Sequence, residues 1–177
     1  MVPITVLKAV QDVLKTPGTL RMDWFQFARI ESEQDSDMFR IEATNGCAAI
    51  SVLFSSPDYV DWGGKVWVEE SNLRQGLKEG GDVTPYLIEQ EPNGYPAGLQ
   101  TYLDGLMKRS ISEEVDIHLS ASYWKLIATV LTSLKVSSKP VCLACSSNVG
   151  PLKVTIAGGQ DAEWLEVTLY VMGVRRD

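Results

Sequence analysis

Few residues in this sequence of 177 have side chains suited to catalysis or metal binding. The sole histidine, His118, lies in an alternating segment typical of a strand, and one histidine supplies neither a multi-histidine metal site nor a conventional Ser-His-Asp arrangement. Cys142 and Cys145 form a Cys-x-x-Cys pair inside an expected strand, where their odd offset sends the side chains to opposite faces. No second Cys-x-x-Cys completes a zinc site. We therefore expect strand or core roles for these residues, with no metal and no cofactor.

The remaining candidate motifs are an acidic segment and two glycine pairs. Residues 31–37 form an acidic turn without the glycine and bidentate glutamate of an EF-hand, which predicts a solvated hairpin tip. Gly63-Gly64 and Gly158-Gly159 do not lead into a Gly-Lys-Ser/Thr helix start, so neither matches a phosphate-binding loop. No set of catalytic residues emerges, and we expect a protein that is not an enzyme. An unrelated enzyme on an α+β scaffold stays open as an alternative.

Composition sets the class of protein. With 45% hydrophobic and 22% charged residues the chain is typical of a globular domain. The formal net charge of −7 argues against a surface coated with phosphate-binding cations, although a local basic stripe is compatible with it. The absence of a long apolar run or signal sequence, together with three cysteines, predicts a cytoplasmic protein with reduced thiols and no membrane contact.

The first third of the chain predicts a helix followed by three strands. Apolar residues at helical spacing place the helix at 5–15, ending at Thr16-Pro17-Gly18. Strands are expected at 24–30, 38–44 and 47–54. Asn45-Gly46 between the last two is a strong hairpin signal, because both positions tolerate positive φ.

The middle of the chain predicts shorter elements. A clean alternation marks a strand at 65–69, followed by a helix at 71–78 with Ser71 as its N-cap and Gly80-Gly81 at its end. An edge strand is expected at 83–90, since Pro85 excludes a central position. Residues 91–112 are expected to form a connection with about one helical turn within 99–107.

The last third repeats the order of the first. A strand at 115–119 precedes a helix at 122–135, capped by Ser120 or Ser122, and strands at 141–145, 152–156 and 164–171. We therefore predict one α+β domain over 1–177, with half-repeats at about 1–69 and 115–177 joined by 70–114. Both long helices should pack side by side on one face of two antiparallel sheets, with Ile41 and Ala43 on one strand face and Arg40 and Glu42 on the other.

The expected helices also carry cations on their exposed sides. If all three helices lay on one face, these cations would share a surface able to follow DNA phosphates without reading sequence. They are Lys8, Lys15, Arg74, Lys78, Lys125 and Lys135.

Several strings resemble the bacterial DNA sliding clamp, the β subunit of the replicative polymerase. Phe39-Arg-Ile-Glu-Ala-Thr-Asn-Gly-Cys-Ala-Ala-Ile50 resembles the clamp strand that reads Val-Ala-Thr-Asp-Gly-His-Arg-Leu-Ala. The segment 65–77 resembles the strand and helix that follow it, and Tyr95-Pro96 with Leu103 resembles the Phe-Pro-Asp-Tyr segment. The ending Leu169-Tyr-Val-Met-Gly-Val-Arg175 resembles the clamp tail Tyr-Val-Val-Met-Pro-Met-Arg-Leu. The resemblance implies a DNA-clamp-like fold of duplicated units.

The resemblance also implies a hydrophobic pocket for short clamp-binding peptides. The matching positions are Thr44, Gly46, Cys47, Ala49, Pro96, Val171, Met172, Gly173, Val174 and Arg175. Here Cys47 and Ala48 replace the family's His and Arg, and Gly173 replaces its tail proline. Strand alternation would place Cys47, Ala49, Met172 and Val174 on one face. There they would form either the apolar floor of this pocket, with Pro96 at its rim, or plain core packing under a covering loop.

Three functional hypotheses follow. The first is a processivity factor that assembles head-to-tail as a homo-oligomeric ring on duplex DNA and binds DNA polymerase or other proteins through clamp-binding peptides. The second is a non-ring module or decoy that binds such peptides without retaining DNA. The third is the unrelated enzyme named above.

Overall fold

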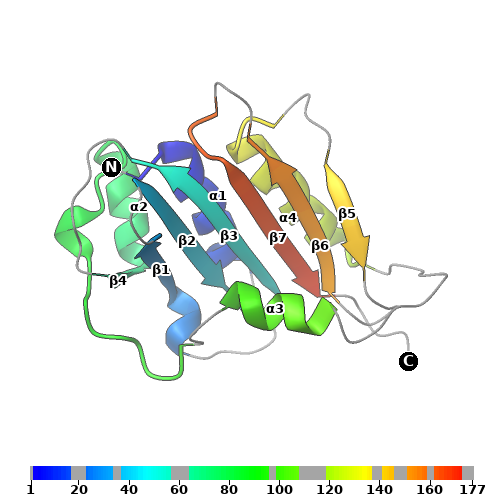
Figure 1. Cartoon of the computed structure of the whole chain (residues 1–177), viewed down its shortest axis with the longest axis horizontal. Helices are drawn as coiled ribbons and strands as arrows, with labels where there is room; N and C mark the ends of the chain where they lie inside the picture. Colours follow the sequence, from blue (N-terminus) through cyan, green and yellow to red (C-terminus); the bar gives the residue numbers. More distant parts are fainter. Residues whose placement is uncertain are drawn as a thin grey trace.

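In the described residues, seven strands form one antiparallel sheet in the order β4-β1-β2-β3-β7-β6-β5 (Figure 1). The computed structural model describes residues 2–16, 23–33, 37–56, 64–95, 99–107, 119–136, 141–145, 151–158 and 162–172. Helices α1 (Ile4–Lys15), α2 (Glu70–Lys78) and α4 (Ala121–Ser133) lie on one face, and α3 (Leu99–Met107) crosses the other. We call these the helix face and the outer face.

Two meanders meet in the middle of the sheet. The first contains β1 (Phe27–Ser32), β2 (Met38–Thr44) and β3 (Ala48–Ser55), with β4 (Lys65–Glu69) paired to β1. The second contains β5 (Cys142–Cys145), β6 (Pro151–Ala157) and β7 (Glu166–Met172). The expectation of two sheets is wrong, because β3 and β7 pair antiparallel and satisfy backbone groups that would otherwise form two sheet edges.

The main core lies between the sheet and the helix face. Val6, Leu7, Val10 and Val13 of α1 are all buried there, as the helical spacing of the sequence predicts. Helix α4 lies beside α1, and the hydroxyl of Ser133 donates a 2.7 Å hydrogen bond to Asp12. The side-by-side packing of the two long helices is therefore confirmed.

The order helix then three strands occurs twice, in α1-β1-β2-β3 and α4-β5-β6-β7. The strand order is mirrored about the β3–β7 pair. Ile41 and Ala43 point into the main core, whereas Arg40 and Glu42 lie on the outer face. Glu42 is nonetheless buried, because Arg29 and Tyr95 cover it on that face.

Local structure departs from expectation at several places. The strand expected at 24–30 begins at Phe27, after a 3₁₀ helix at Asp23–Gln26. Helix α2 begins one residue earlier than expected, with Glu69 and not Ser71 at its N-cap. Residues 83–90 form a 3₁₀ helix at Thr84–Tyr86 and a single bridge between Trp67 and Ile88, since Pro85 fits the start of such a turn.

The connecting segment carries more helix than one turn, because α3 is nine residues long. The strand expected at 115–119 lies outside the described residues except for Leu119, which is not in a strand, and His118 also lies outside them. Each helix in the described ranges is too short or too polar to span a membrane.

Candidate functional site

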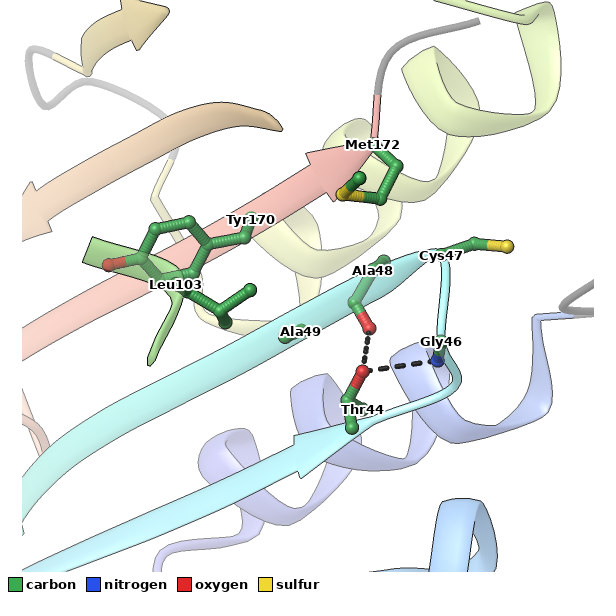
Figure 2. Close-up of a pocket in the computed structure, with 8 residues that line it drawn as sticks. All are labelled: Thr44, Gly46, Cys47, Ala48, Ala49, Leu103, Tyr170 and Met172. Carbon is green, nitrogen blue, oxygen red and sulfur yellow. Dashed lines mark hydrogen bonds between the residues drawn. The ribbon is translucent and has the colours of Figure 1, made fainter. Parts of the chain in front are cut away.

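The turn between β2 and β3 shapes one side of a pocket. Gly46 has φ +84°, and a Cβ at this position would lie 2.7 Å from the ring of Phe25. Glycine is therefore required both by conformation and by space. The hydroxyl of Thr44 donates a 2.8 Å hydrogen bond to the Ala48 carbonyl and accepts a 3.1 Å bond from the Gly46 amide (Figure 2).

The side chain of Asn45 fastens this turn to the end of α1. Its amide nitrogen donates to the carbonyl oxygens of Val13 and Thr16, at 2.9 Å and 2.7 Å. Its oxygen accepts from the backbone amides of Cys47 and Ala48, at 2.9 Å and 2.8 Å. Asn45 thus bonds the Val13 carbonyl, which also accepts a 3.2 Å bond from the Thr16 amide, and the Thr16 carbonyl just beyond the helix.

A pocket opens between this turn, the start of β3, the end of β7 and α3 (Figure 2). Its empty volume is about 210 Å³, part of which is open to solvent. Ala49 lies opposite Tyr170 in the β3–β7 ladder, and the Met172 amide donates a 2.8 Å bond to the Cys47 carbonyl. The lining residues are Thr44, Gly46, Cys47, Ala48, Ala49, Leu103, Tyr170 and Met172.

Helix α3 covers part of the pocket floor. Leu99 and Leu103 form a small apolar cluster with Ala49 and Tyr170, separate from the main core. Burial and the hydrogen bond that its hydroxyl donates to Asp104 raise the pKa of Tyr170 well above its usual range. Tyr170 is therefore a neutral donor at this site.

The structure brings together half of the residues that sequence reasoning assigned to the pocket. Thr44, Gly46, Cys47, Ala49 and Met172 line it. Val171 does not, because it lies on the helix face, fully buried in the main core. Pro96, Gly173, Val174 and Arg175 lie outside the described residues.

Cys47 contributes to the rim but not to an apolar floor. Its thiol points away from Ala49 and Tyr170 in Figure 2 and contacts the hydroxyl of Tyr123 in α4. Burial, followed by this contact, raises the pKa of Tyr123 to about 12. The expected alternation fails because Cys47 belongs to the turn and β3 begins at Ala48.

Sequence reasoning does not assign Leu103 or Tyr170 to the pocket. Tyr170 lies two residues before Met172 on the same strand face, so the offset-of-two rule could have identified it. Leu99 and Leu103 have the i, i+4 spacing of one helix side, but the prolines and glycines before them favour a connection.

The predicted cations lie on the helix layer. Lys8, Lys15, Arg74, Lys78, Lys125 and Lys135 are all exposed, and α1, α2 and α4 share one face of the sheet. Lys15 lies 3.7 Å from Asp12, and Arg74 lies 3.0 Å from Glu70. The other four form no ion pair with any residue that the structure describes. Within those residues, no group of three His, Cys, Asp or Glu side chains is placed to hold a metal ion.

No protein-family model and no curated protein matches this sequence. Solved structures do. The DNA polymerase III β chain of Streptococcus pneumoniae matches with TM-score 0.56 and 12% identity, over 98% of this chain and 64% of that one. The β subunit of Thermotoga maritima matches with TM-score 0.55 and 11% identity, over 97% and 64%.

A third structure, the Helicobacter pylori β clamp bound to a DNA ligase peptide, matches with TM-score 0.58 and 11% identity, over 98% of this chain and 63% of that one. This chain thus spans less than two thirds of the length of these clamps. At such identities the likeness is one of fold. The chain is built on the fold of the bacterial DNA polymerase III β clamp, as its turn and tail sequences predict.

Proposed function

We propose that this protein is a non-enzymatic, clamp-like accessory factor of DNA replication or repair that acts as one clamp-like domain. Its pocket at the β2–β3 turn receives the apolar anchor of clamp-binding peptides from a DNA polymerase or other proteins. The observation that carries the proposal is the convergence of the family's pocket positions. Thr44, residues 46–49 and Met172 come from distant parts of the sequence and line one pocket.

The chemistry of the pocket suits a peptide side chain. Its cavity volume of about 30 Å³ is far below that of typical small-molecule sites, which hold about 300–1,000 Å³. Ala49, as a small residue, leaves space beside the half-buried, flexible side chain of Met172. A Leu or Phe anchor inserted here would be removed from water. Anchor residues that are buried in this way supply most of the binding free energy of a peptide. The H. pylori clamp with its DNA ligase peptide is a precedent for this class of partner.

Fluorescence anisotropy with a labelled Gln-Leu-x-Leu-Phe peptide tests the proposal. We expect saturable binding to the wild type and a loss of at least about tenfold for Met172→Lys, because the new charge would have to be desolvated beneath the anchor. Met38→Lys is the matched control, since Met38 is also half-buried but lies at the opposite end of β2. No binding to the wild type at high micromolar concentration would contradict the proposal.

A second candidate function is a homo-oligomeric ring on duplex DNA. It is favoured by the exposed cations of α1, α2 and α4 on one face of an otherwise acidic protein. Peptide binding without retention on DNA would instead favour the non-ring module or decoy.

A further inference from the structure

The floor of the pocket is already covered by this chain's own side chains. Ala49 is 3% exposed and Tyr170 is 1% exposed, because Leu99 and Leu103 of α3 pack on them. The space that remains lies beside Leu103. The cavity of about 30 Å³ beside Leu103 is too small for a Leu or Phe side chain, so such an anchor can pack against Ala49 and Tyr170 only if Leu103 moves aside.

One carboxylate holds α3 in this position. Asp104 follows Leu103 directly, and its Oδ1 accepts hydrogen bonds from the hydroxyl of Tyr170 and, at 2.6 Å, from Nζ of Lys153. The Lys153 ammonium also lies 5.5 Å from the centre of the Tyr170 ring. We call these three residues the Asp104 cluster (Asp104, Lys153 and Tyr170).

The geometry of the Asp104 cluster suits a latch, by which we mean a set of polar contacts that holds α3 against the sheet. Lys153 and Tyr170 are cross-strand partners on β6 and β7, so both donors project from the same rigid place in the sheet. Asp104 is the single charged residue of α3. Loss of its charge therefore removes the ion pair that joins α3 to β6.

We propose that α3 is a lid over the peptide pocket, held closed by the Asp104 cluster, and that a bound peptide displaces Leu103. This inference rests on the proposed function. If only open molecules bind peptide, the apparent affinity is the intrinsic affinity multiplied by the fraction of molecules in the open state. Weakening the latch therefore raises peptide affinity as long as the open state is the minor one.

The test combines amide hydrogen exchange with the peptide titration, on the full chain. Asp104→Asn keeps the shape of the side chain and removes its charge, and Lys153→Met removes the other charge and keeps the length. For each variant we expect exchange in residues 99–107 and peptide affinity to rise together, on the order of tenfold. Exchange in β2 and β3 should stay unchanged, which separates lid opening from global unfolding. Glu89→Gln is the charge-matched control, because Glu89 is exposed and follows Ile88, which bridges to β4 at the opposite edge of the sheet.

The outcomes separate the lid from the pocket. Unchanged exchange in 99–107 in both variants would overturn the latch. Faster exchange with weaker peptide binding would identify α3 as a fixed wall of the pocket and would overturn the lid. Faster exchange in the variants, with no peptide binding by any protein, would support the latch and contradict the proposed function.

Discussion

The side chain of Asn45 joins the β2–β3 turn to α1 by hydrogen bonds from its amide nitrogen and to its amide oxygen. It makes four hydrogen bonds and is 4% exposed. We expect Asn45→Ala to lower the free energy of unfolding by about 2–4 kcal/mol, because buried backbone groups at both α1 and the turn lose their partners. Urea denaturation measures the change. Asn93→Ala is the control, since Asn93 lies in an exposed turn and its loss should cost less than about 0.5 kcal/mol. Equal effects of the two variants would contradict this role for Asn45.

Sequence reasoning at the residue scale succeeds where the requirement is local. The Asn-Gly pair predicts a turn, and Gly46 does adopt positive φ, although Asn45 does not. The contact between Tyr170 and Asp104 escapes sequence reasoning, because the two residues lie 66 positions apart and Asp104 is in a segment without a strong pattern. The sequence places Cys47 on the same face as Ala49, because it treats Cys47 as the first residue of the strand. The turn is one residue longer than expected, so the alternation of β3 begins only at Ala48.

At the scale of elements, a buried ion pair joins β1 and β2 on the outer face. Nη2 of Arg29 lies 2.6 Å from a carboxylate oxygen of Glu42, and both side chains are almost fully buried. We expect Glu42→Ala to cost about 3–5 kcal/mol of stability, because it leaves the guanidinium buried without this carboxylate.

The double variant Arg29→Met/Glu42→Leu is the control for that prediction. It removes both charges and refills the space with apolar groups, and should recover most of the lost stability. Thermal and urea unfolding of the two variants give the comparison. A double variant as unstable as Glu42→Ala would show that the ion pair is not the cause of the loss.

Elements with a clear period are predicted well. The strands 38–44 and 65–69 and the helices α1 and α4 follow from alternation or helical spacing alone. The strand expected at 83–90 is wrong because its apolar residues are interrupted by Pro85, which favours the 3₁₀ turn. The single sheet is not predictable in the same way, since nothing local in β3 or β7 indicates which strand pairs with its free edge.

At the scale of the whole molecule, the helix layer of an acidic protein exposes six cations. If the helix face contacts duplex DNA, changing Lys8, Lys15 and Lys125 to Glu should weaken non-specific binding. The plot of the logarithm of the DNA association constant against the logarithm of the salt concentration should also become shallower. Its slope should change by about 0.9 for each phosphate that the protein no longer neutralises. Lys65→Glu is the control, because Lys65 lies in the edge strand β4 of the sheet. Binding that is unchanged by the reversals, or insensitive to salt, would remove the DNA role.

Assembly is a separate property of the whole molecule. A ring needs head-to-tail interfaces that close, and the two ends of the sheet differ. Ile88 forms two 2.8 Å backbone bonds with Trp67 beside β4, whereas Leu143 in β5 is exposed. For the ring we expect oligomers in size-exclusion chromatography with light scattering. A strict monomer at tens of micromolar would contradict the ring and leave the peptide-binding module.

The central claim is that a peptide anchor enters the pocket beside Met172. NMR of the protein labelled on its methionine methyl groups tests this directly, because the chain has five methionines and Met172 lines the pocket. On addition of the Gln-Leu-x-Leu-Phe peptide, we predict a saturable shift of the Met172 methyl signal and no shift for Met38. A peptide with both leucines and the phenylalanine changed to alanine should leave both signals in place. A bound peptide that leaves Met172 unshifted would contradict the account.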